Sequence, residues 1–407
     1  MPEPGEEKDD LSAPGGRPRI LTFLSSYLPA FRSGGPIRTL EAMTTQMSDE
    51  WEFLIVAADR DFGDDGPFPD VPVDTWTSYG PARVFYRSPG LGGWLALLRS
   101  LRSIDYDVIY LNSFFGIHAS LIPLLCRRIG ALRTRPIVIA PRGELDAGAL
   151  ALKHQKKAIF LTAARILHLH LGAVWHASNP VERESIRRHT GAPAGKVFQA
   201  LDLSGRSSGA PNVTRERAPG EPLRITFLSR ISPIKNLLFA LDALAGVTVP
   251  VRFDIHGIIE DIAYWKRCEE AIATLPPHVT ASYVGEVRPD EVERTLAPYD
   301  LFLFPTQGEN YGHVIRESLS AGVPALISNM TPWRNLEARG AGADLPLDDP
   351  RRFAAWIDAY ERLPAEERAA MRTAAIRAGD DPEAAASNLQ DNRNLFRAAL
   401  TLASRGR

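Results

Sequence analysis

The feature that most constrains the fold is an alternation of short strand-like runs with helical stretches, which occurs twice along the 407 residues. The runs are rich in Val and Ile and are bounded by polar, Gly or Pro residues, as in buried parallel strands. In the first half they span residues 19–26, 52–58, 107–112, 136–141 and 173–178. In the second half they span residues 224–229, 250–257, 279–285, 300–305 and 324–328. This alternation predicts an α/β protein with two Rossmann-like, doubly wound domains facing a cleft.

Composition shifts along the chain predict where these domains begin and end. Residues 1–16 are polar, acidic and rich in Pro and Gly, and they lack the apolar core of a signal peptide, so we expect a disordered tail. The predicted segments are a first domain over 17–202, a linker over 203–222, a second domain over 223–384 and a final segment over 385–407.

Overall composition excludes several functional classes. The chain is 44% hydrophobic and 24% charged with a net charge of −2, so we expect a globular protein with no nucleic-acid partner. Cys126 and Cys268 lie far apart and lack metal-ligand spacing. They indicate buried thiols in a reducing, cytoplasmic compartment, with no disulfide and no metal site.

The longest apolar stretch, 158–177, is interrupted by Arg165, His168 and His170. It therefore falls short of the ~20 apolar residues of a membrane span. Two interpretations stay open: a mostly buried core helix, or a surface that contacts a bilayer or a lipid acceptor. A peripheral contact with the inner membrane face is thus an expectation of this sequence.

Ligands of such sheets bind beyond the carboxyl ends of the strands, and the first of these ends is glycine-rich. Gly34 and Gly35 would let a ligand approach the backbone, and Arg38 in the following helix could meet a phosphate. An ordinary loop and helix start explains the same residues.

The corresponding strand end of the second half is basic. Arg230 and Lys235 follow residues 224–229, and a helix is predicted to start near Pro233. An Arg and a Lys beside a helix N-terminus form a strong local anion site. The alternative is a solvated pair of basic residues.

The segment 308–328 carries two carboxylates, Glu309 and Glu317, eight positions apart. A turn that ends at Gly312 separates Glu309 from the helix that carries Glu317. Hydroxyls on the carboxylates and a phosphate at the helix start would hold a nucleotide sugar. The alternative for Glu317 is a surface ion pair with Arg316 or His313.

A fourth strand end, after residues 136–141, presents Arg142 and Gly143. Arg142 could reach a ligand in the cleft. The lysines that follow, Lys153, Lys156 and Lys157, are typical of a solvated helix face.

The second half resembles the retaining family-4 glycosyltransferases of the GT-B fold. The resemblance depends on FLSRISPIKNL, VGEV and DLFLFPTQGENYGHVIRESLSAGVPALIS, and it covers about residues 224–346. It covers the first half more loosely, through SGGPIRTLEAM, YDVIYLNSFFG and APRGEL. It implies that the final segment, from about residue 385, forms a helix that crosses back to the first domain.

The resemblance also implies roles for individual residues. Arg230 and Lys235 would hold the donor diphosphate, and Glu317 would bind the nucleotide ribose. Glu309 would contact the transferred sugar. The expected donor-binding residues around this carboxylate are Asn310, Tyr311, Gly312 and His313, and the glycine loop of the first domain adds Gly34, Gly35 and Arg38.

These roles imply transfer of a sugar from a nucleoside diphosphate to a hydroxyl acceptor with retention at the anomeric carbon. The leaving phosphate would take the acceptor's proton on the same face, with no metal and no cofactor other than the UDP- or GDP-type co-substrate. Arg230 and Lys235 would stabilise the charge that grows on that phosphate. The sugar, the base, the acceptor and the oligomeric state are left open.

One departure from the family pattern concerns a His that many members carry after the strand at 136–141. This chain has Arg142 there, and an Arg cannot act as a base near neutral pH. His118 is a candidate to fill the gap, and His176 a weaker one, but each has a structural alternative.

Two other functions fit the same residues. One is a nucleotide-sugar epimerase or hydrolase of the same fold, and the other is a catalytically silent nucleotide-binding protein. A dehydrogenase is disfavoured because no G-x-G-x-x-G fingerprint occurs at a strand–helix junction.

Overall fold

The computed structural model describes residues 16–32, 34–146, 150, 157, 161–162, 164, 167–205, 217–218 and 220–404. The chain divides into two compact units. The first unit comprises Met1–Leu203 and Asn388–Arg407, and the second comprises Ser204–Ser387. Most of the predicted tail and linker, residues 1–15, 206–216 and 219, lies outside the described residues.

The first unit is built on an eight-stranded sheet in the order β3-β4-β2-β1-β5-β6-β7-β8. Its strands are β1 Arg19–Phe23, β2 Glu52–Ala58, β3 Trp76–Tyr79, β4 Ala82–Arg87, β5 Val108–Leu111, β6 Ile137–Ile139, β7 Val174–Ala177 and β8 Val197–Gln199. All neighbours pair in parallel except β3, which is antiparallel to β4. The sheet is doubly wound, because β1 lies between β2 and β5 and the strand order reverses there.

Helices cover both faces of this sheet. The described helices of the unit are α1 Gly35–Gln46, α2 Gly90–Ser100, η1 Ile117–Leu121, α3 Ile122–Arg128, α6 Pro180–Thr190 and η2 Ala194–Lys196. Helices α2 and α3 share one core cluster with Phe23 and Leu111, whereas α1 shares a second cluster with Ile20 and Val108. These strand residues alternate in sequence, so the two clusters occupy opposite faces of the sheet.

The second unit is a six-stranded parallel sheet in the order β11-β10-β9-β12-β13-β14. Its strands are β9 Leu223–Leu228, β10 Val251–His256, β11 Val279–Gly285, β12 Leu301–Phe304, β13 Ala325–Ser328 and β14 Gly342–Leu345. Its helices are η3 Pro233–Lys235, α7 Leu237–Ala245, α8 Ile262–Ala273, η4 Pro289–Glu291, α9 Val292–Leu296, α10 His313–Ser320, α11 Pro350–Arg362 and α12 Ala365–Gly379. The strand order reverses between β9 and β12, so the loops after these two strands flank the expected ligand position.

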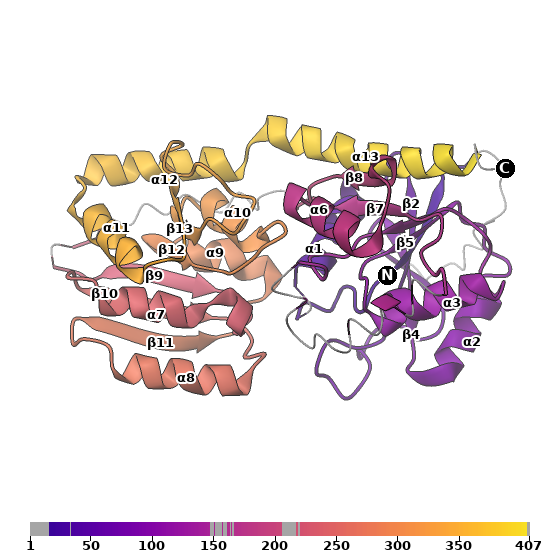
Figure 1. Ribbon diagram of the computed structural model, residues 1–407. Helices are drawn as coiled ribbons and strands as arrows, with labels where there is room; N and C mark the ends of the chain where they lie inside the picture. Colours follow the sequence, from indigo (N-terminus) through magenta and orange to yellow (C-terminus); the bar gives the residue numbers. More distant parts are fainter. Residues whose placement is uncertain are drawn as a thin grey trace, which may run out of the picture. The chain divides into compact units, whose positions relative to one another are not determined.

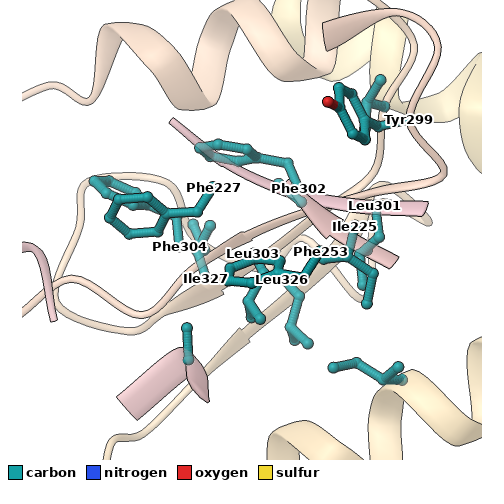
Figure 2. Close-up of a cluster of buried hydrophobic side chains, with 14 of the residues drawn as sticks. Ile225, Phe227, Phe253, Tyr299, Leu301, Phe302, Leu303, Phe304, Leu326 and Ile327 are labelled. Atoms are coloured by element: carbon teal, nitrogen blue, oxygen red, sulfur yellow. The ribbon is translucent and has the colours of Figure 1, made fainter. Parts of the chain in front are cut away.

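Large aliphatic and aromatic side chains fill the core of the second unit. Figure 2 shows β9 and β12 contributing Phe227 and Phe304, whose ring centroids lie 5.7 Å apart. Leu301, Phe302 and Leu303 are also fully buried. Strand β12 is therefore covered on both of its faces, as its uninterrupted apolar sequence predicts.

The last helix, α13 Pro382–Ser404, returns to the first unit, where its Asn388–Ser404 part packs (Figure 1). Phe396 is fully buried among aromatic side chains of that unit. Arg393 contacts Asp49 at 2.9 Å, and Asn392 donates to the Leu201 carbonyl oxygen at 2.9 Å. The predicted fold, two doubly wound α/β units with a returning C-terminal helix, is confirmed.

Within the described ranges, no helix has both the length and the apolarity that crossing a membrane requires. In the stretch 158–177, residues 167–172 form turns and Val174–Ala177 form β7, so the prediction of a core helix is wrong for this part. Much of 158–166 lies outside the described ranges, and the predicted contact with a bilayer or lipid acceptor is not tested.

Candidate functional site

The loops that follow β9 and β12 are joined by hydrogen bonds. Asn236 Nδ2 donates to the Pro305 carbonyl oxygen at 2.9 Å. The Ile234 carbonyl oxygen accepts from the Gln307 N–H at 2.8 Å and from Thr306 Oγ1 at 3.1 Å. The two loops therefore form one framework at the carboxyl edge of the central strands.

This framework brings Lys235 and Glu309 together. The Lys235 ammonium donates to Glu309 Oε1, and the two side chains are only 12% and 16% exposed. Lys235 Nζ also lies 5.8 Å from the centroid of the Phe304 ring. The partly buried position makes the Lys235–Glu309 attraction stronger than it would be in water.

Helix α10 begins beside this ion pair. Gly312, with a left-handed φ of 80°, precedes its first residue and has no side chain with which to cap it. The Tyr311 carbonyl oxygen accepts from Trp333 Nε1 at 2.7 Å, and the Tyr311 ring lies 4.7 Å from the His313 ring. These contacts hold the turn that precedes α10, where the positive end of the helix dipole lies.

Glu317 lies in the second turn of α10 and is half-buried. Its neighbour Arg316 is directed to Asp380, with Nη2 2.7 Å from Oδ1. The Ser320 hydroxyl donates to the same carboxylate oxygen at 2.7 Å. Arg316 thus anchors α10 through Asp380. This ion pair explains the position of the Arg316 side chain, so the alternative ion pair with Glu317 is not needed to explain it.

Arg230, the other predicted cation, lies at the exposed end of the β9 loop. Its Nη1 is 2.7 Å from Glu260 Oε1, and its side chain is 42% exposed. The structure therefore pairs Lys235 with Glu309 and Arg230 with Glu260. Sequence reasoning missed Glu260, Asn236 and Thr306; of these, Thr306 carried a signal, as a polar residue just beyond a buried strand.

In the first unit, the glycine loop after β1 is fixed by a residue that the sequence did not indicate. Asp61 Oδ2 accepts from the N–H groups of Phe31 at 2.8 Å and Arg32 at 3.1 Å. Gly34 has φ 70° and ψ −132°, a combination that favours glycine, and α1 starts at Gly35. Arg38 follows in the first turn of α1 and is half-buried.

Arg142 is held inside the first unit. Its guanidinium, 6% exposed, pairs with Asp202 and donates through Nη2 to Tyr110 OH at 2.7 Å and to Asn112 Oδ1 at 2.9 Å. Glu144, which sequence reasoning missed, accepts from the N–H groups of Phe114 and Phe115. A catalytic role for Arg142 stays a prediction.

His176 belongs to the same buried network. Its Nε2 is 2.8 Å from the Ala200 carbonyl oxygen, which can only accept, so Nε2 carries the proton. Nδ1 then accepts from Tyr110 OH at 2.8 Å. Burial lowers the pKa of His176 to about 4, and the Arg142 charge acts in the same direction. His176 is a neutral, structural residue.

We expect this buried imidazole to make the first unit sensitive to acid. Because its pKa is about 4 in the folded protein and 6.5 as the reference value, only the unfolded chain binds the proton between these values. Stability relative to His176→Gln should therefore fall by about 1.4 kcal/mol for each pH unit below 6.5. Urea titrations of both proteins at about pH 7 and about pH 5 measure this. A difference that does not change with pH would contradict it.

His118 lies on the surface of the first unit, in η1. Its Nδ1 accepts from Trp94 Nε1 at 3.3 Å, and the two rings stack with centroids 6.2 Å apart. Partial burial lowers the pKa of His118, and Arg87 adds to this effect. The imidazole is therefore neutral near pH 7, and a role for His118 in the reaction stays a prediction.

Among the residues that the structure describes, no group of three or more His, Cys, Asp or Glu side chains could hold a metal ion. Cys126 and Cys268 are both buried free thiols, as the sequence predicted.

Residues 212–378 match the family model described as "Glycosyl transferases group 1". The match covers most of the second unit, Ser204–Ser387. The protein is therefore an enzyme of the glycosyltransferase class, and the coarser part of the predicted function is confirmed. No curated protein sequence matches the chain.

Solved structures of glycosyltransferases share the fold over nearly the whole chain. Anabaena Alr3699/HepE in complex with UDP-glucose is 17% identical with a TM-score of 0.66, covering 95% of this chain and 99% of that chain. Sucrose-phosphate synthase from Thermosynechococcus elongatus is 14% identical with a TM-score of 0.70, covering 94% and 100%. These structures confirm that this chain has the GT-B fold.

Proposed function

We propose that the protein is a retaining, family-4 type glycosyltransferase that moves a sugar from a nucleoside diphosphate to a hydroxyl acceptor. The observation that supports this best is the Lys235–Glu309 pair beside the start of α10, inside the glycosyltransferase domain. A UDP-type donor is favoured because HepE of the same fold binds UDP-glucose. The acceptor would carry a free hydroxyl, as in envelope glycans, lipid-linked sugars or secondary metabolites.

The charges of Lys235 and of the start of α10 suit the diphosphate, which is the leaving group of this reaction. A lysine ammonium has three N–H donors, and Lys235 donates one of them to Glu309. The others would donate to the diphosphate, whose charge the N-terminus of α10 also stabilises. Glu309 would then keep the ammonium in place while it accepts a sugar hydroxyl, and Glu317 would accept the ribose hydroxyls.

The bond changes balance without an enzyme nucleophile. The anomeric carbon–oxygen bond to the phosphate breaks, and the acceptor oxygen bonds to the same carbon on the same face. The acceptor proton passes to the departing phosphate oxygen. The side chains hold both substrates and stabilise the growing negative charge, so positively charged residues supply what a metal supplies elsewhere.

A thermal-shift series with UDP, GDP and their sugars tests the proposal. A ligand at about 100 times its dissociation constant should stabilise the second unit by about 2.7 kcal/mol. Radiolabelled transfer to a hydroxyl acceptor with the best donor then separates a transferase from a hydrolase. Absence of stabilisation by every nucleotide and nucleotide sugar would overturn the proposed function.

Replacement of Glu317 by alanine should weaken donor binding about 100-fold, because charge-assisted hydrogen bonds to the ribose contribute about 2–3 kcal/mol. Isothermal titration with the best donor measures the change. Glu270→Ala, at an exposed position of α8, is the matched control and should bind as the wild type does. Wild-type affinity in Glu317→Ala would contradict the ribose role.

A further inference from the structure

An apolar and basic surface of the first unit plays no part in the proposed transfer reaction. Exposed aliphatic side chains gather on α2, on η1 and on α3. They are Leu91 at 74% exposure, Leu95 at 42%, Ile117 at 60%, Leu125 at 39% and Ile129 at 77%. We call these residues, together with the exposed arginines Arg99, Arg102 and Arg128, the α2–α3 surface.

These helices lie on the same face of the sheet, and α2 and α3 are labelled in Figure 1. Both contribute to the same core cluster, through Leu97 and Leu124. Trp94 of α2 contacts His118 of η1, and Arg133 after α3 donates to the Arg102 carbonyl oxygen at 3.1 Å. Because their buried sides face the same sheet, their exposed sides face solvent together.

The spacing of the exposed residues makes each helix amphipathic. Leu91 and Leu95 are four positions apart on α2, and Leu125 of α3 lies four positions before Ile129, which directly follows that helix. Ile117 lies in η1, which precedes α3. Residues four positions apart occupy neighbouring positions on one side of a helix. The surface therefore combines an apolar pair on α2, an apolar pair at the end of α3 and Ile117 on η1, rather than singly scattered exposed residues.

The charge of this region is strongly positive. Residues 90–135 contain six arginines and two aspartates with no lysine or glutamate, a surplus of four positive charges in a chain whose net charge is −2. Among the described residues, Arg99, Arg102 and Arg128 have no carboxylate within ion-pair distance. Arg99 and Arg128 lie in the last turns of α2 and α3, and Arg102 follows α2.

This combination favours an anionic lipid bilayer over other occupants. Exposed aliphatic side chains insert into the interface of a membrane, while arginines bind its negative headgroups. A symmetric dimer through this surface would instead place the same arginines against each other, which like-charge repulsion disfavours. We propose that the α2–α3 surface docks the protein peripherally on an anionic membrane.

Co-sedimentation of the full chain with vesicles tests this, without nucleotide sugar, so that its result is independent of the transfer proposal. Binding is expected to vesicles of phosphatidylcholine and phosphatidylglycerol, to weaken with added salt, and to be much lower with phosphatidylcholine alone. No binding to the anionic vesicles, or equal binding to both vesicle types, would overturn the proposal.

Paired variants separate the two contributions. Each arginine should contribute roughly five-fold, so Arg99→Gln, Arg102→Gln and Arg128→Gln together should weaken binding roughly 100-fold. The matched control changes the exposed arginines Arg294, Arg351 and Arg352 of the second unit to Gln and should bind normally.

Leu91→Ser with Ile129→Ser should likewise reduce binding, whereas Val181→Ser with Ile262→Ser, each 69% exposed elsewhere, should not. If the Leu91/Ile129 variant binds like the wild type, or if it instead dissociates a dimer in sedimentation velocity, the bilayer is not the partner and the inference fails.

Discussion

Lys235→Ala is expected to lower kcat/KM for sugar transfer by about 100- to 1000-fold, the effect of removing one preorganised group from a developing negative charge. Lys235 is the cation that the structure holds partly buried at the edge of β9 and β12, bonded to Glu309. Its ammonium would meet the leaving phosphate where water screens it least. Steady-state kinetics with the best donor and acceptor measure the loss.

Arg230 provides an informative comparison for this prediction. Because it is more exposed and already paired with Glu260, Arg230→Ala should cost less than Lys235→Ala. Lys266→Ala, at an exposed position of α8, should leave turnover unchanged, and thermal melts should show that all three variants fold. Unchanged turnover in Lys235→Ala would remove our account of leaving-group stabilisation.

Phe396→Ala should have the largest effect on stability, about 3–5 kcal/mol in the first unit. The Phe396 ring is fully buried, with centroids 5.6 Å from Trp51 and 5.1 Å from Tyr110. The substitution leaves a cavity where α13 meets the sheet, so the first unit should unfold at lower urea concentration. Tryptophan fluorescence and circular dichroism during a urea titration measure the shift.

The matched control for this prediction is Phe62→Ala, the same chemical change at a ring that is 65% exposed in the same unit. It should change stability by less than about 0.5 kcal/mol. If Phe396→Ala lost no more stability than Phe62→Ala, the contact between α13 and the first unit would not contribute to folding as the structure indicates.

The local sequence pattern was sufficient to predict most strands of the two sheets. Strands β2 and β11 have the limits expected from the sequence, 52–58 and 279–285. An uninterrupted apolar run identifies β2, whereas β11 is a mostly exposed strand that ends at Gly285. Strands β3, β4, β8 and β14 were not predicted. β3 and β4 are rich in polar and aromatic residues, and their pairing, for example Trp76 with Phe85, exists only once the chain has folded back on itself.

The sequence predicted which residues belong to the candidate site, but not which of them form ion pairs. Lys235 and Glu309 each stood out because they follow a buried strand, yet 74 positions separate them. Arg142 stood out for the same reason, but its partner Asp202 lies 60 positions away and was not anticipated.

The sequence alone determined the two α/β halves, the strand ends that carry charge and the glycines beside them, because these depend on neighbours within a few residues. The tertiary structure decided which charges meet, since that depends on strand order: β9 lies beside β12 only in the assembled sheet, and this contact joins the loops that hold Lys235 and Glu309. It also decided that His176 is buried and neutral, because its partners Tyr110 and Ala200 come from other parts of the first unit.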